Sequence, residues 1–194
     1  MTPRIPALEP PYAPDVAEEL AAMMPPGVPP LRLFRTLAHN PRVLRKIRHG
    51  NLLDRGSLAR RDRELVILRT TARCGCAYEW GVHAAYFARR VGLEEAQLRA
   101  TLHGGAGDPA FDERDRALVR LCDELHDTAQ LSEAAYEAVS SHFAPEQIVE
   151  LLVLAGFYHA ISFVANGLRV APEAFAPGLP AGGARRGVVH SERH

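Results

Sequence analysis

The stretch from Arg61 to Leu93 reads RDRELVILRTTARCGCAYEWGVHAAYFARRVGL. It contains two runs with helical patterning, which meet at the short corner Cys74-Gly75-Cys76. The first run includes Leu65-Val66-Ile67-Leu68, which is apolar on all sides and therefore predicts a buried, central helix. Nothing in the stretch alternates as a strand does. We therefore predict an all-α fold built around a helical hairpin.

Four side chains of this hairpin are candidates for chemistry. Cys76, Glu79 and His83 are three, four and seven positions apart, so at ~100° per residue they would share one face of a helix. Glu64, on the first run, could reach the same place across the hairpin. Each also has a structural explanation. Cys76 could be a buried, inert cysteine, Glu79 and His83 could form an ion pair that fixes the corner, and Glu64 could be an exposed first-turn acid.

The composition of the chain favours a one-domain globular protein over a nucleic-acid-binding or disulfide-rich secreted one. The chain has 194 residues, of which 47% are hydrophobic, and this suits one domain with a sizeable core. Lys+Arg and Asp+Glu balance at 23 each, so no global field attracts nucleic acid or an anionic membrane. Three cysteines make no disulfide framework, and the opening MTPRIPALEPPYAPD lacks the apolar core of a signal peptide. We expect a cytoplasmic protein.

Proline and glycine divide the chain into three parts. Residues 1–29 are expected to form an extended arm with one short helix, 30–171 a helical domain, and 172–194 a flexible Pro/Gly/Arg-rich tail. Within these parts, apolar periodicity and capping residues predict helices over 16–24, 31–40, 41–53, 59–73, 77–91, 93–103, 113–129, 132–143 and 145–170.

The last helix is apolar enough to suggest a membrane span between Ile148 and Ala165. It carries Glu150 and His159, which are costly at a bilayer centre, so we interpret it as the buried helix of a soluble protein. Its polar residues Tyr158, Ser162 and Asn166 step by four, with His159 beside them. That line predicts either a pocket wall or a set of hydrogen-bonded core groups.

No metal or cofactor is expected. Cys76, Glu79 and His83 could supply three ligands, but Cys74 precedes the corner and no second His or Cys pair is spaced to complete a tetrahedron. The sequence has no phosphate-binding loop, dinucleotide fingerprint or Ser-His-Asp order.

The spacing of these residues resembles the carboxymuconolactone decarboxylase and alkylhydroperoxidase-D-like family. The peroxidase branch carries E-x11-C-x-x-C-x-x-x-H, and the decarboxylase-like branch carries Tyr-Glu-Trp-x-x-His. Glu64 and Cys76 match the first pattern, and Tyr78-Glu79-Trp80-Gly81-Val82-His83 matches the second. LFRTLAHNPRVL and GFYHAISFVANGL are similar to flanking segments, so the resemblance covers roughly residues 30–170.

The resemblance implies an all-α fold, a site on the hairpin and a homo-oligomer (dimer, trimer or hexamer). In the peroxidase branch two thiols cycle through a disulfide while the Glu and His move protons. Glu79 stands where the peroxide-attacking cysteine would be, and a carboxylate cannot form a sulfenic acid. A one-thiol cycle stays open, in which Cys76 reacts and Cys74 or an outside thiol resolves it.

Three functional hypotheses follow. The first is a cofactor-free acid/base enzyme for a small carboxylate or lactone, in which Glu79 and His83 move protons and Glu64 orients His83. The second is a thiol-dependent alkyl hydroperoxide reductase, an antioxidant peroxiredoxin-type activity, using Cys76. The third is a non-enzymatic oligomeric stress protein. We expect no nucleic-acid or membrane partner, and a substrate pocket lined by Tyr78, Trp80, Phe87, Tyr158 and His159.

Overall fold

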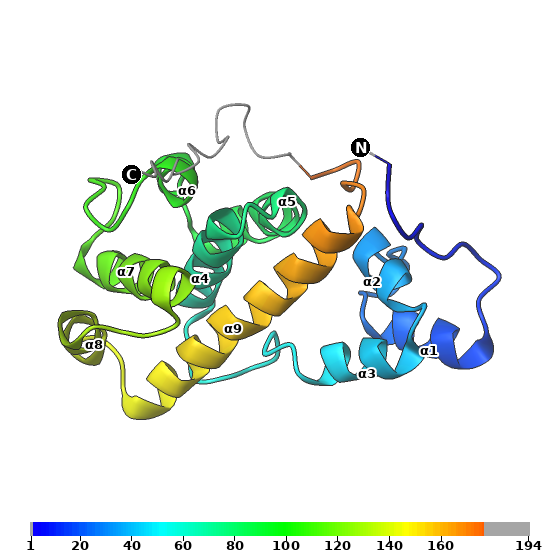
Figure 1. The fold of residues 1–194 in the computed structure, drawn as a ribbon, viewed down its shortest axis with the longest axis horizontal. Coiled ribbons are helices and arrows are strands. Elements are labelled where there is room, and N and C mark those ends of the chain that lie inside the picture. Colours follow the sequence, from blue (N-terminus) through cyan, green and yellow to red (C-terminus); the bar gives the residue numbers. More distant parts are fainter. Residues whose placement is uncertain (1, 177–194) are drawn as a thin grey trace, which may run out of the picture.

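The computed structural model describes residues 2–176, and every regular element in that range is helical (Figure 1). The all-α prediction is therefore confirmed. The elements are α1 (Pro14–Ala22), α2 (Arg32–Leu37), α3 (Pro41–His49), α4 (Arg60–Arg73), α5 (Ala77–Tyr86), the 3-10 turn η1 (Ala88–Val91), α6 (Glu95–His103), α7 (Glu113–Thr128), α8 (Glu133–Ser140) and α9 (Pro145–Leu168).

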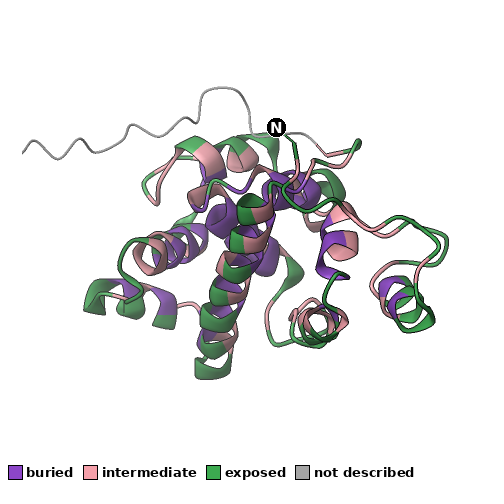
Figure 2. Cartoon of the chain, turned by 45° about the vertical axis from the view of Figure 1, so that its right-hand side comes forward, coloured by how far each residue is buried: buried purple, intermediate pink, exposed green. Residues whose placement is uncertain are grey.

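Helices α4 and α9 form the centre of the molecule. α4 packs against α5, α6, α7 and α9, and α9 runs diagonally between this group and α1–α3 (Figure 1). One apolar cluster joins α4 to α7, α8 and the first half of α9. A second joins α1–α3 to the start of α5 and the last half of α9. Buried residues accordingly gather where these helices meet (Figure 2).

The third helix is shorter than its apolar pattern predicts. It ends at His49 rather than near residue 53, and Leu52 has a φ of +53° that no helix continues through. The chain then crosses to α9, where the backbone and hydroxyl of Ser57 both donate to a Glu150 carboxylate oxygen, at 2.7 and 2.6 Å. A Cβ at Gly56 would collide with the same carboxyl group, so a larger residue there would displace the Glu150 side chain from Ser57.

The helix expected over residues 77–91 is in two pieces. α5 ends at Tyr86, the backbone turns at Phe87, and η1 follows. Gly92 closes η1 with a φ of +76°, a left-handed conformation that glycine adopts without strain. The break changes the direction of the chain directly after the residues that face α9.

A buried arginine holds α4 against α6 and α7. Arg69 makes a two-pronged ion pair with Asp123, at 2.7 and 2.8 Å, and also donates to the carbonyls of Thr101 and Gly104. A buried guanidinium is tolerated only when its donors are satisfied in this way. Arg69 thus fixes the back of the hairpin on which the site is built.

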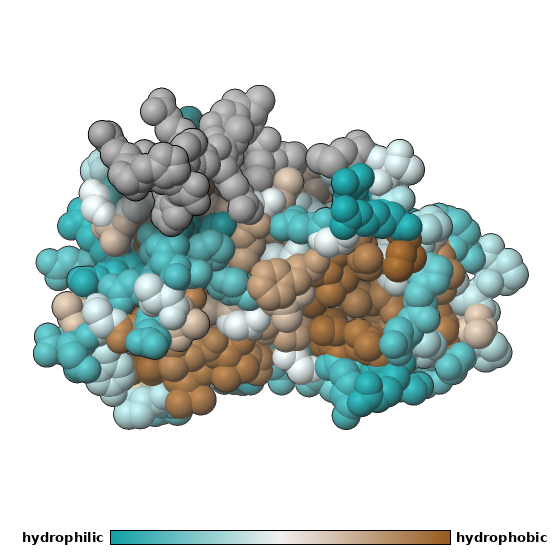
Figure 3. All heavy atoms as spheres, in the orientation of Figure 1, coloured by the Kyte–Doolittle hydropathy of each residue, from teal (hydrophilic) through white to brown (hydrophobic). Residues whose placement is uncertain are grey.

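The outer face of α9 is exposed and apolar. Val149, Val153 and Phe163 are 62%, 53% and 69% exposed, and Figure 3 shows hydrophobic residues gathered over the lower half of this helix. By length and composition α9 could cross a membrane, with 44% of its most apolar window buried. The core helix of a soluble protein passes the same test, so this feature alone does not assign a membrane span.

The segment after α9 is described only in part. Residues 177–194, most of the expected tail, lie outside the described residues. Within the described part, Glu173 accepts hydrogen bonds from the Tyr78 hydroxyl at 2.6 Å and the Arg32 amide at 2.5 Å. Residues 172–176 therefore pack against the end of the helical domain.

Candidate active site

The corner between α4 and α5 positions the candidate residues. Gly75 adopts a φ of +61°, which reverses the chain sharply, and the Cys76 amide donates back to the Thr71 carbonyl at 2.8 Å. α5 therefore starts at Ala77 and returns alongside α4. This hairpin places Glu64, in the first half of α4, opposite His83 on α5.

A short hydrogen bond joins Glu64 and His83 across the hairpin. The His83 Nδ1 lies 2.7 Å from the Glu64 Oε2, and both side chains are buried. Arg63 forms an ion pair with the other carboxylate oxygen, at 3.4 Å. A carboxylate paired in this way accepts, so Nδ1 carries the proton and donates the hydrogen bond to Glu64.

The second ring nitrogen of His83 is directed toward two further acidic groups. Its Nε2 lies 3.1 Å from the Tyr158 hydroxyl and 3.7 Å from the Glu79 Oε2. With the proton held on Nδ1, Nε2 has a lone pair, so the Tyr158 hydroxyl donates to it. The result is an imidazole fixed in one tautomer, with its basic nitrogen facing Glu79 and Tyr158.

Burial favours the protonated form of both neighbouring acids. Desolvation raises the pKa of the Glu79 carboxyl above its usual range, and the nearby His83 opposes this only in part. Desolvation also raises the pKa of Tyr158 well above its ordinary value, and the charges of Glu79 and Glu64 add to the effect. A basic nitrogen beside a carboxylic acid is an arrangement suited to proton transfer.

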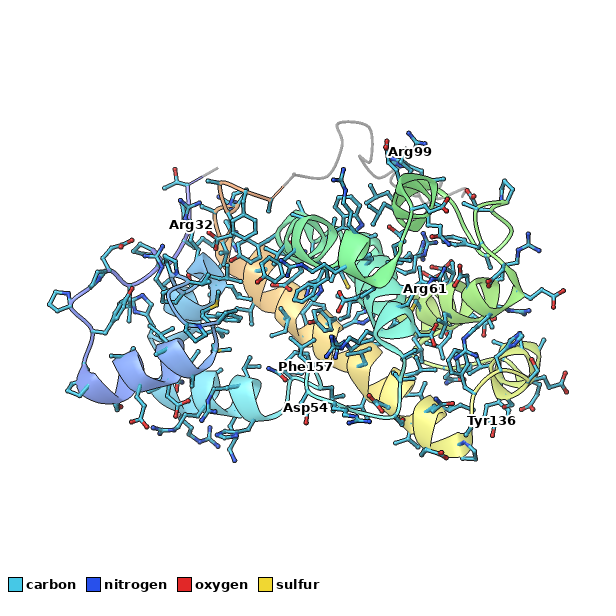
Figure 4. All side chains as sticks on the ribbon, turned by 180° about the vertical axis from the view of Figure 1, so that it is seen from behind. Arg32, Asp54, Arg61, Arg99, Tyr136 and Phe157 are labelled. Carbon is cyan, nitrogen blue, oxygen red and sulfur yellow. The ribbon has the colours of Figure 1, made fainter. Side chains whose placement is uncertain are left out.

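These groups open onto a cavity of about 660 Å³ between α5, α9 and the N-terminal helices. Glu79, His83 and Tyr158 line its inner end, while Glu64 lies behind His83 and does not line it. Figure 4 shows, from behind, Phe157 on α9 and Arg32 at the start of α2, and both residues line the cavity. Its remaining walls are mostly apolar, and include Met23, Leu31, Phe34, Val82, Phe87 and Ile161.

The outer wall of the cavity comes from segments that sequence patterns did not connect with the site. Residues 23–35 and 173–175 are far from the hairpin in sequence, yet both line the cavity. Tyr78 links them, because its hydroxyl accepts from the Leu33 amide at 3.0 Å and donates to Glu173. No local sequence signal reports such long-range contacts.

Of the five residues expected to line the pocket, two line the cavity and three do not. Phe87 and Tyr158 line the cavity, and the Phe87 ring stacks on the His83 ring with centroids 5.1 Å apart. Trp80 points to the opposite side of α5, where its Nε1 donates to the Thr101 hydroxyl at 3.0 Å. Tyr78 is buried in the apolar cluster behind the wall, and His159 faces α7.

Cys76 also lies apart from the cavity. It is the N-cap of α5, with ψ at +84°, so the helical rotation that aligns Glu79 and His83 does not extend to it. Its thiol is fully buried in an apolar cluster, close to the Ser162 side chain. Burial raises the pKa of the Cys76 thiol to about 11, which opposes thiolate formation.

A second polar group lies outside the cavity. The Cys74 Sγ is 3.9 Å from the His126 Nδ1, which is 3.1 Å from the His159 Nε2. These three atoms come from the end of α4, from α7 and from α9, and all lie within 4.8 Å of one another. Local residue spacing does not predict this group, because its members are 33 or more residues apart in the sequence.

Known proteins resemble this chain in sequence over the hairpin and in overall fold. A sequence model of the carboxymuconolactone decarboxylase family matches residues 40–124. A putative antioxidant defence protein AhpD from Agrobacterium tumefaciens is 27% identical with a TM-score of 0.56, covering 60% of this chain and 80% of that one. No curated protein matches the chain at a significant level.

Two further solved structures share the fold over most of the chain. An alkylhydroperoxidase AhpD core, a peroxidase-related protein from Ralstonia eutropha JMP134, is 20% identical with a TM-score of 0.75, covering 88% of this chain and 93% of that one. A debrominase, Bmp8, in complex with 2,3,4-tribromopyrrole is 13% identical with a TM-score of 0.74, covering 90% and 94%.

Residues 40–124, which include the hairpin, therefore match the carboxymuconolactone decarboxylase family, and the chain shares the fold of AhpD-like helical proteins. The resemblance drawn from the hairpin motif is confirmed at the level of the family.

The burial of Cys76 predicts a thiol that peroxide does not reach. With a pKa of about 11, only about one thiol in ten thousand is ionised at neutral pH, and the side chain is buried and does not line the cavity. Under mild peroxide, peptide mapping should find Cys76 reduced in the folded protein and oxidised in the urea-unfolded chain. A sulfenate or mixed disulfide at Cys76 in the folded protein would contradict this.

Proposed function

We propose that this protein is a cofactor-free acid/base enzyme that moves a proton on a small, largely apolar carboxylate or lactone. The observation that carries the proposal is the buried Glu64–His83 hydrogen bond, with the other ring nitrogen of His83 lying beside Glu79 at the wall of the cavity. A carboxylate that orients an imidazole, and an imidazole that faces substrate, form a recurrent proton-transfer arrangement.

Each residue takes a distinct part. His83 Nε2 acts as the general base, and Glu64 is a positioning residue that holds the ring and stabilises the positive charge it acquires. In its protonated form, which burial favours, Glu79 donates a hydrogen bond to the oxygen on which negative charge develops. The Tyr158 hydroxyl, 3.1 Å from Nε2, must yield that nitrogen to the substrate and can then add a second donor.

The cavity favours an apolar or aromatic-derived substrate. Most of its walls are aliphatic or aromatic, and its two arginines are engaged elsewhere: Arg35 donates to the Leu8 carbonyl and Glu9, and Arg32 donates to the Pro172 carbonyl. Its size suits a compound of one or two rings. The debrominase Bmp8, which shares the fold, holds a small aromatic compound.

The thiol-dependent alternative has less support from the geometry. The peroxidase-related relatives share the fold, but here the position of the second cysteine is Glu79, and Cys76 is buried outside the cavity. Proton chemistry therefore needs only groups that reach the cavity, whereas thiol chemistry needs Cys76 to move out of the core.

Substitutions separate the two activities. Small lactones and carboxylates, including aromatic-derived ones, would be screened by NMR in D2O for turnover or exchange of a carbon-bound proton. We expect His83→Gln to lower the rate by roughly 100-fold or more, in line with the usual contribution of a general base, and Glu64→Gln to lower it through loss of ring orientation. The matched control Cys76→Ser should keep the rate.

The raised pKa of Glu79 predicts how the activity depends on pH. Since the acid form is active and its pKa is raised, activity should persist above the usual carboxyl range and fall as pH rises through the raised pKa. Glu79→Gln keeps a donor that cannot ionise, so this fall should disappear. Loss of activity in Cys76→Ser with retention in His83→Gln would overturn the proposal in favour of thiol chemistry.

We also propose that two copies associate through the outer face of α9. Its exposed positions Val149, Val153, Gly156, Ala160 and Phe163 step by three and four, which is the pattern of a helix that packs on another helix. The small residues at its centre would allow close approach, and an apolar surface of this kind usually marks a protein interface.

Val153→Glu would place a charge in the middle of this face and is expected to convert an oligomer to monomers in sedimentation velocity, with helical content unchanged. The control, Tyr136→Glu on α8, replaces a residue that is 50% exposed but lies away from this face. An unchanged oligomer in Val153→Glu, or a wild-type protein that is already monomeric, would contradict the assignment.

A further inference from the structure

We propose that Cys74, His126 and His159 form a zinc-binding site, separate from the cavity and with no part in its proton chemistry. Three elements supply the ligands: the end of α4, the last turn of α7 and the middle of α9. None of the three residues lines the cavity.

The distances suit one tetrahedral ion. With Zn–N bonds of about 2.05 Å and a Zn–S bond of about 2.3 Å, tetrahedral angles place two nitrogens about 3.3 Å apart and a sulfur about 3.6 Å from a nitrogen. The His126 Nδ1 and His159 Nε2 are 3.1 Å apart, and the Cys74 Sγ is 3.9 Å from Nδ1. The Cys74 Sγ and the His159 Nε2 lie within 4.8 Å of each other, so closing this third edge to about 3.6 Å takes a shift of about 1.2 Å or less.

The outer contacts of the ligands support this arrangement. The His159 Nδ1 lies 2.9 Å from the Ala155 carbonyl, which can only accept, so this nitrogen carries the proton and Nε2 keeps its lone pair toward the cluster. A backbone acceptor on the far nitrogen is the usual support for a metal-binding histidine. Asn166 donates to the Cys74 carbonyl at 2.9 Å and anchors the sulfur-bearing residue to α9.

The proton balance of binding is simple. Without metal, the His126 Nδ1–H donates to the His159 Nε2. On binding, the His126 proton passes to its Nε2, the Cys74 thiol releases its proton to solvent, and three lone pairs become available to the cation. No electron is transferred, because zinc has no redox chemistry in proteins.

The donor set selects the kind of ion. A thiolate with two imidazoles favours zinc over calcium or magnesium, which prefer oxygen ligands. Cys74 is buried and both histidines are half-buried, so the cluster is sheltered but reaches the surface.

The test is a zinc titration of the full-length protein after treatment with a chelator, against a competing indicator of known affinity. We expect one tight site per chain, with affinity lowered roughly 100-fold or more in each of Cys74→Ser, His126→Asn and His159→Asn, because each removes a direct ligand. Cobalt(II) should give a thiolate-to-metal absorption band that Cys74→Ser abolishes.

Two controls keep the result interpretable. His103→Asn removes an exposed histidine of α6 and should leave the affinity unchanged. The paired replacement of His190 and His194 by Asn tests the histidines that follow the described residues, and it too should leave the affinity unchanged.

Circular dichroism would show whether each variant is folded, so that a loss of zinc binding is not confused with a loss of structure. If one ligand variant is misfolded, the affinities of the other two decide the test. Absence of a tight site, binding removed by the His190/His194 replacement, or unchanged affinity in correctly folded ligand variants would overturn the proposal. The assay reads the metal itself, so its failure leaves the proposed acid/base activity untouched.

Discussion

The site depends on one hydrogen bond between two buried side chains on opposite arms of a hairpin. A carboxylate as deeply buried as Glu64 is costly unless it is paired, and His83 supplies the partner at 2.7 Å. The bond can form because Gly75 turns the chain within a single residue and the apolar packing of Leu68 on α4 against Trp80 on α5 holds the two helices together. The same hydrogen bond fixes the orientation of the His83 ring at the wall of the cavity.

Burial assigns different chemistry to neighbouring groups. On one short helix, Glu79 and His83 reach a cavity, while Cys76 starts the same helix inside an apolar cluster. Desolvation raises the pKa values of both the carboxyl and the thiol, yet the consequences are opposite. A protonated carboxylic acid can still donate, whereas a protonated, enclosed thiol is a poor nucleophile. The environment therefore favours proton transfer over thiol chemistry.

The sequence predicted the hairpin and the shared face of Glu79 and His83, because these two residues follow helical spacing on a helix whose pattern is clear. Glu64 was expected beside them only because the hairpin could bring it there and the family resemblance implied it. The same rotation count misplaced Cys76, since an N-cap residue has left the helical backbone. Groups gathered by packing alone escaped prediction: the cavity wall from residues 23–35 and 173–175, and the Cys74, His126 and His159 cluster. Their positions depend on how whole helices meet, which local periodicity does not encode.

The tautomer of His83 tests the central claim most directly. Nitrogen-15 NMR of histidine-labelled protein near neutral pH, assigned with His83→Gln, distinguishes a proton on Nδ1 from one on Nε2. The account predicts a proton on Nδ1, hydrogen-bonded to Glu64 and perturbed in Glu64→Gln, with Nε2 bare. A His83 ring with its proton on Nε2 and a bare Nδ1 would contradict it.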